Sequence, residues 1–157
     1  MHPKPQKNYP KEIPAMFDPS RDQARQFFVS AWAKHRNREV LTQLEIIAAD
    51  LVAHHPEYHA LLEDPEAVMK DFSPEDGQIN PFLHLSLHLA IEEQLSINQP
   101  PGIREAFEAC QGRHGDRHAA LHDVLDCLGE TIWKAQRDKA PLDGRAYVEA
   151  VRKRASN

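Results

Sequence analysis

The stretch that decides the fold is NPFLHLSLHLAIEEQL, residues 80–95. Its middle, LHLSLHL, alternates apolar and polar residues as a strand does. Asn80 followed by Pro81, however, is typical of a helix N-cap and the first helical position. The end, AIEEQL, consists of good helix formers, and β-branched residues are nearly absent from the stretch. We therefore predict a helix from about Pro81 to Ser96, buried on most sides because leucines surround it.

Helical periodicity recurs along the rest of the chain. Thr42 and Glu45 lie in TQLE, a capping-box pattern that predicts the start of a second helix. Short helical segments are expected between residues 56 and 70. The other expected helices cover residues 20–36, 103–111, 116–138 and 145–154. The pattern predicts an all-α, compact helical bundle of about four main helices plus short helices.

The first 16 residues, MHPKPQKNYPKEIPAM, differ in composition from the rest. They hold four prolines and almost no apolar pattern, so we expect residues 1–16 to form an extended, disordered arm. Residues 17–157 are expected to form a single helical domain.

Composition and charge exclude several classes of protein. The formal net charge is −5, whereas a general nucleic-acid-binding surface is basic. The longest apolar run, residues 83–91, is too short to cross a bilayer, and no signal segment opens the chain. Cys110 and Cys127 do not make a disulfide framework. We expect a cytoplasmic protein without nucleic-acid or membrane partners, and a homo-oligomer is compatible with these features.

Histidine is unusually frequent, with ten in 157 residues. Residues four apart share one face of a helix, and three segments each hold such a pair. The pairs are His55 and His59, His84 and His88, and His118 and His122, with Glu92 one turn beyond His88. A helical wheel places the second and third pairs on inward faces, while Pro56 leaves His55 at a helix end. We predict that the second and third pairs reach one centre, with His55 or His59 contributing from the third segment.

Two interpretations account for these histidines. Imidazoles on facing helices can bind a metal together, which predicts a divalent metal site, zinc or iron, with one or two ions. The candidate ligands are His55, His59, His84, His88, Glu92, His118 and His122. Such a centre would suit a metal-dependent enzyme with redox or hydrolytic chemistry, whose substrate the sequence does not name. The alternative is a non-enzymatic interaction or scaffold protein whose histidines form hydrogen bonds in the core.

Several segments resemble a bacterial family, domain of unknown function family 1841. They are MFDPSRDQARQFF at 16–28, HPEYHALLEDPE at 55–66, DGQINPFLHLSLHLAIEEQ at 76–94, PPGIREAF at 100–107 and HAALHDVLDCLGETIWKAQR at 118–137. The resemblance covers nearly all of the chain after residue 16. It implies a small cytoplasmic protein and brings no catalytic residue with it, but its segments contain all six paired histidines.

Overall fold

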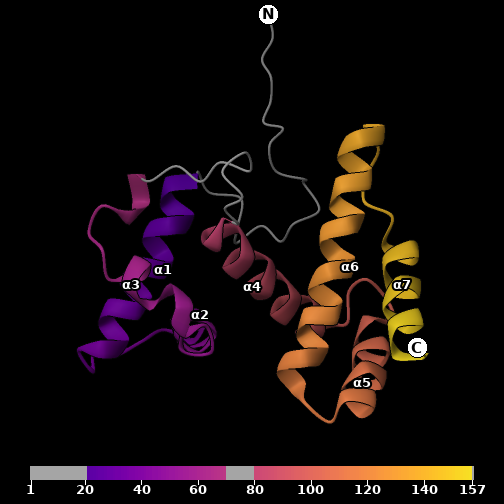
Figure 1. Cartoon of the computed structure of the whole chain (residues 1–157), viewed down its shortest axis with the longest axis horizontal. Helices are drawn as coiled ribbons and strands as arrows, with labels where there is room; N and C mark the ends of the chain where they lie inside the picture. The colour runs from indigo at the N-terminus through magenta and orange to yellow at the C-terminus, as the bar shows by residue number, and fades with distance from the viewer. Residues whose placement is uncertain (1–20, 70–79, 157) are drawn as a thin grey trace, which may run out of the picture. The chain divides into compact units, whose positions relative to one another are not determined.

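A computed structural model describes residues 21–69 and 80–156, and every regular element in these ranges is a helix (Figure 1). Two of the elements are short 3-10 helices, η2 (Pro56–Tyr58) and η3 (Ala67–Met69). The α-helices in the described ranges are α1 (Arg21–Arg36), α2 (Gln43–Ala53), α3 (His59–Leu62), α4 (Pro81–Ile97), α5 (Ile103–His114), α6 (Arg117–Asp138) and α7 (Gly144–Ser156). The all-α prediction is confirmed, although seven α-helices exceed the expected four main ones. The predicted arm over residues 1–16 lies outside the described residues.

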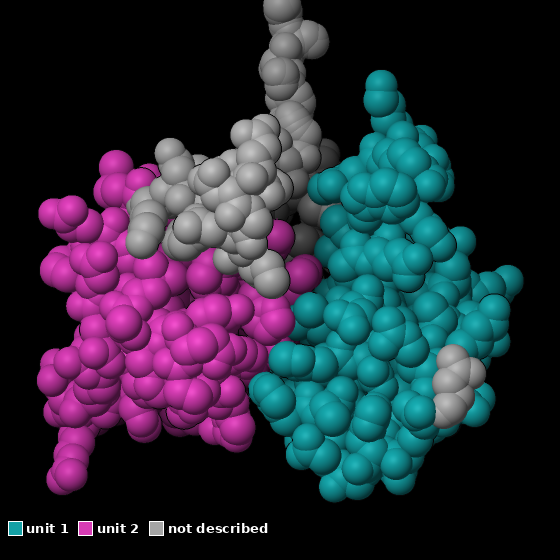
Figure 2. Space-filling view, in the orientation of Figure 1, with its two compact units in different colours: residues 1–18, 90–157 teal, residues 19–89 magenta. Residues whose placement is uncertain are grey.

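The chain divides into two compact units, which Figure 2 colours separately. Unit 2 consists of residues 19–89 and contains α1, α2, α3 and the first half of α4. Unit 1 consists of residues 1–18 and 90–157, and contains the second half of α4 with α5, α6 and α7. Helix α4 therefore begins in one unit and ends in the other. The prediction of a single domain over residues 17–157 stays a prediction.

Helix α2 in unit 2 begins at the predicted capping box. The Glu45 backbone N–H donates to the Thr42 hydroxyl at 3.2 Å, and the Thr42 N–H donates to the Glu45 carboxylate at 2.9 Å. Lys34 of α1 adds an ion pair to the same carboxylate at 2.9 Å. These contacts, the Thr42 backbone bond first, lower the pKa of Glu45. The cap thus fixes where α2 starts and ties it to α1, against which it packs.

Helix α4 starts at the predicted cap as well. The Asn80 side-chain oxygen accepts from the N–H groups of Phe82 and Leu83 at 3.0 and 3.2 Å, and Pro81 is the first helical residue. The helix interpretation of residues 81–96 is therefore confirmed. Leu85, Leu87 and Leu89 are buried, whereas Leu83 is half exposed, so solvent reaches one strip of the helix.

In unit 1, helices α5, α6 and α7 pack against one another. The Arg104 guanidinium of α5 donates to the carbonyls of Leu95 and Ser96 at the end of α4, both at 3.0 Å. The Tyr147 hydroxyl of α7 donates to the Gln94 side chain at 2.6 Å. These bonds join the second half of α4 to the helices that follow it.

Helix α6 buries one face and leaves the neighbouring positions partly exposed. His118, His122 and Leu125 are half-buried. The fully buried positions are Ala120, Leu121, Val124, Cys127 and Leu128.

Candidate metal centre

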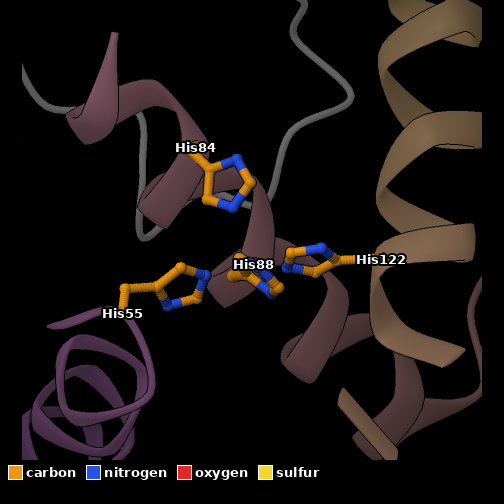
Figure 3. A group of neighbouring side chains, drawn as sticks. All are labelled: His55, His84, His88 and His122. Carbon is orange, nitrogen blue, oxygen red and sulfur yellow. The ribbon is translucent and has the colours of Figure 1, made fainter. Parts of the chain in front are cut away.

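Three histidines of unit 2 converge on one point (Figure 3). His55 lies just after α2, and His84 and His88 lie one turn apart on α4. The ring centroids are 4.8 Å apart for His84 and His88, 4.9 Å for His55 and His88, and 5.0 Å for His55 and His84. Each ring offers one nitrogen that lies within 4.8 Å of the nitrogens offered by the other two. We call these three residues the histidine triad.

The triad is shielded from solvent. His88 is 0% exposed and His55 is 1% exposed, while His84 is half-buried. Each ring meets the other two at interplanar angles between 62° and 74°, so the three rings pack edge to face rather than stack in a column. The neutral imidazole is the form of histidine that binds metals.

One hydrogen bond determines the tautomer of His55. Its Nδ1 lies 2.7 Å from the Leu51 carbonyl oxygen. A carbonyl oxygen only accepts, so Nδ1 carries the proton and, in the neutral ring, Nε2 carries the lone pair. Metal-binding histidines usually donate their second ring N–H to a carbonyl or carboxylate in this way, which fixes the ring and raises its basicity.

The spacing of the triad suits a single ion. Three imidazoles bound to one tetrahedral metal at about 2.0–2.1 Å place their ring centroids about 5 Å apart. The observed centroid separations of 4.8, 4.9 and 5.0 Å match this arrangement closely. The spacing of the three rings is therefore compatible with ligation of one ion.

The aromatic ring of Tyr58 lies beside the triad. The sequence analysis did not predict this contact. Its ring is parallel to that of His55, with an interplanar angle of 3° and centroids 5.5 Å apart. It meets the His84 ring edge-on at 5.9 Å. Burial, followed by the charge of Glu57, raises the pKa of Tyr58, so its phenol stays protonated at neutral pH. The three-residue spacing of His55 and Tyr58, with Pro56 between them, is the feature of the sequence that indicates this contact.

His59, the second histidine of the HPEYH segment, has a different environment. Its Nε2 donates to the Val52 carbonyl at 2.8 Å, and its ring packs on Trp32 with centroids 4.6 Å apart. It is not a member of the group of converging ligand atoms that includes the triad. These contacts connect His59 to the end of α2 and to Trp32 of α1. The prediction that His59 is a metal ligand stays a prediction.

The remaining candidates lie in unit 1. Arg117 donates to both carboxylate oxygens of Glu92 at 3.0 Å, which makes a two-bond ion pair. His118 and His122 lie one turn apart on α6, with ring centroids 4.5 Å apart, and Figure 3 also labels His122. The predicted roles of these three residues as ligands or supporting groups stay predictions.

The two cysteines do not offer thiolate ligands. Both are buried and free. Burial, with a smaller effect from Asp123, raises the pKa of Cys110 to about 11, and burial also raises the pKa of Cys127. Both thiols are therefore neutral at physiological pH, and Cys110 donates a hydrogen bond to the Val151 carbonyl at 3.4 Å.

No helix in the described part of the chain is both long and apolar enough to cross a membrane. Comparison with curated proteins and with solved structures finds no match. A family model, Domain of unknown function (DUF1841), matches residues 20–153. This match includes both units' described helices up to Lys153 and all three residues of the triad. The chain therefore belongs to the DUF1841 family.

Proposed function

We propose that this protein binds one divalent transition-metal ion through His55, His84 and His88. The observation that carries the proposal is the convergence of three imidazoles from two segments at centroid separations of 4.8 to 5.0 Å. The proton on His55 Nδ1 supports it, because it leaves Nε2 as the ligating nitrogen.

Three neutral nitrogen ligands favour zinc or iron over magnesium and calcium, which prefer oxygen. A single ion suits the triad. Four-coordinate zinc needs one further ligand beyond three histidines, either a protein group or water. The predicted ligand roles of His118 and His122 are tested separately by mutation.

A more specific proposal is that the bound metal makes the protein an enzyme with redox or hydrolytic chemistry. It requires a coordination position that water or substrate can occupy. Azide added to the cobalt-loaded protein tests this requirement, since an open position gives a shift of the visible bands and a closed one gives none. The observation that favours the alternative, a scaffold with core histidines, is the pair of ring-to-carbonyl bonds of His55 and His59.

The test is metal binding by protein purified without a polyhistidine tag. We expect about one equivalent of zinc or iron, and a cobalt titration that saturates near one equivalent. His55→Ala and His88→Gln each remove one ligand, and we expect metal affinity to fall at least about a hundredfold. Glutamine at position 88 keeps most of the side-chain volume in a fully buried site.

The matched control is His54→Ala. His54 is the sequence neighbour of His55, but its side chain is 57% exposed and its Nδ1 donates to the Asp50 carbonyl at 2.9 Å. We expect this variant to bind metal as the native protein does. His118→Ala and His122→Ala measure whether the pair on α6 adds a ligand. Folded, native protein that takes up no zinc, iron or cobalt would refute the proposal and favour the scaffold interpretation.

A further inference from the structure

Tyr58 lies against the histidine triad without being one of its candidate ligands. Its ring contacts two of the three rings, parallel to His55 and edge-on to His84. Aromatic rings with centroids about 4.5–7 Å apart in offset-stacked or edge-to-face arrangements attract each other. Tyr58 is therefore placed where it can restrict the movement of the His55 and His84 rings.

The backbone explains why the two rings are neighbours. His55 is the N-cap of η2, Pro56 is its first residue, and the Tyr58 N–H donates to the His55 carbonyl at 2.9 Å. In a 3-10 helix there are three residues per turn, so side chains at i and i+3 eclipse each other. Proline restricts the backbone at the first position of this turn. The HPEY sequence thus places the phenol ring directly beside the imidazole ring.

The hydrogen bond to Leu51 holds the Nδ1 edge of the His55 ring. The direction of Nε2 relative to His84 and His88 depends on the plane of this ring. A flat ring parallel to His55 opposes rotation of this plane, because turning would drive the imidazole edge into the phenol face. The same phenol ring limits the movement of His84 on the other side.

We propose that Tyr58 is a positioning residue for the metal centre: its aromatic ring fixes the plane of His55 so that Nε2 is aimed at the ion. The inference rests on the proposed metal-binding function. The ring carries this role and the hydroxyl does not, so phenylalanine should replace tyrosine and alanine should not.

The experiment compares Tyr58→Ala with Tyr58→Phe by cobalt titration and visible spectroscopy. We expect Tyr58→Ala to bind cobalt about ten- to a hundredfold more weakly, as is usual when a supporting group of a metal site is lost. We also expect its visible bands to move or broaden, because the ligand geometry is less uniform. Tyr58→Phe should restore both the affinity and the spectrum of the native protein.

Trp32→Leu is the matched control, because it removes another aromatic ring that packs on a histidine of unit 2. The ring centroids of Trp32 and His59 are 4.6 Å apart, and Trp32 is 6% exposed. We expect this variant to lose stability in urea while it keeps the native cobalt spectrum and affinity.

The outcomes separate this inference from the proposed function. Native protein that binds no metal overturns both. Native protein that binds cobalt, with Tyr58→Ala equal to it in affinity and spectrum, overturns only the positioning role. Equal losses in Tyr58→Ala and Tyr58→Phe would show that the hydroxyl matters rather than the ring. Equal losses in Tyr58→Ala and Trp32→Leu would reduce the effect to general loosening of unit 2.

Discussion

At the scale of single residues, the two histidines of HPEYH have divided roles. Both donate a ring N–H to a carbonyl near the end of α2, His55 to Leu51 and His59 to Val52. These carbonyls belong to the last turn of α2, and they also accept the backbone N–H groups of His54 and His55 at 3.2 and 2.9 Å. Only His55 also faces the triad, whereas His59 faces Trp32. One residue type in one short motif thus serves both a helix end and a candidate metal centre.

We predict that His59→Ala lowers the free energy of unfolding by about 1–2 kcal/mol and leaves metal affinity unchanged. The loss combines one hydrogen bond to a carbonyl with one aromatic contact on Trp32. Urea unfolding of the metal-free protein measures the first effect, and cobalt titration measures the second. A large drop in metal affinity would instead make His59 a ligand, as the spacing of the motif first suggested.

At the scale of helices, α4 carries two of the three triad residues, and its first turn depends on one side chain. Asn80 accepts from two backbone N–H groups that no helical carbonyl can reach. His84 is in the next turn, and its own N–H donates to the Asn80 carbonyl at 3.1 Å. The cap therefore determines the position at which the histidine stripe of α4 begins.

We predict that Asn80→Ala lowers the free energy of unfolding by about 1 kcal/mol, the usual effect of losing an N-cap side chain. Asn80→Asp keeps the accepting oxygen and should remain within about 0.5 kcal/mol of the native protein. Metal affinity should change little in both, because burial of Leu85 and Leu89 also holds the helix. Urea unfolding provides the measurement, and equal stability of the alanine and native proteins would contradict the capping role.

At the scale of the whole molecule, the triad joins segments about thirty residues apart in the chain, so it exists only when unit 2 is folded. A ligand that binds only the folded state stabilises it by mass action, by about 2.7 kcal/mol when its free concentration is a hundred times Kd. Metal binding should therefore be visible as thermal stability. Protons compete for the same nitrogens, because a protonated imidazole cannot ligate.

We predict that a chelator lowers the Tm of the metal-loaded protein at about pH 8 and has no further effect at about pH 5. The sign follows from competition: the metal-dependent stabilisation is present at high pH and is lost as acid protonates the ligands. His88→Gln should show no chelator effect at either pH. A Tm that stays the same after verified removal of the metal would argue against any contribution of the ion to stability. Scanning calorimetry with elemental analysis of each sample provides the data.

The helices followed from local sequence. The cap residues Asn80 and Thr42 act on N–H groups two or three positions away, so the information lies within one turn. Residues 83–89 alternate as a strand does, but the Asn80 cap and the helix formers that follow favour a helix over a strand here. Leu83 is half exposed because leucines at every second position of a helix cannot all point toward the same side.

Long-range packing chose which histidines meet. Spacing of four treats His55 and His59 alike, but Pro56 breaks α2 between them and the 3-10 turn gives them different neighbours. His55 reaches His84 and His88, and His59 reaches Trp32. Periodicity reports which residues share a face of one helix, whereas convergence depends on how separate segments pack. The candidate ligands were therefore readable as residue types, and the triad became recognisable only in the folded unit.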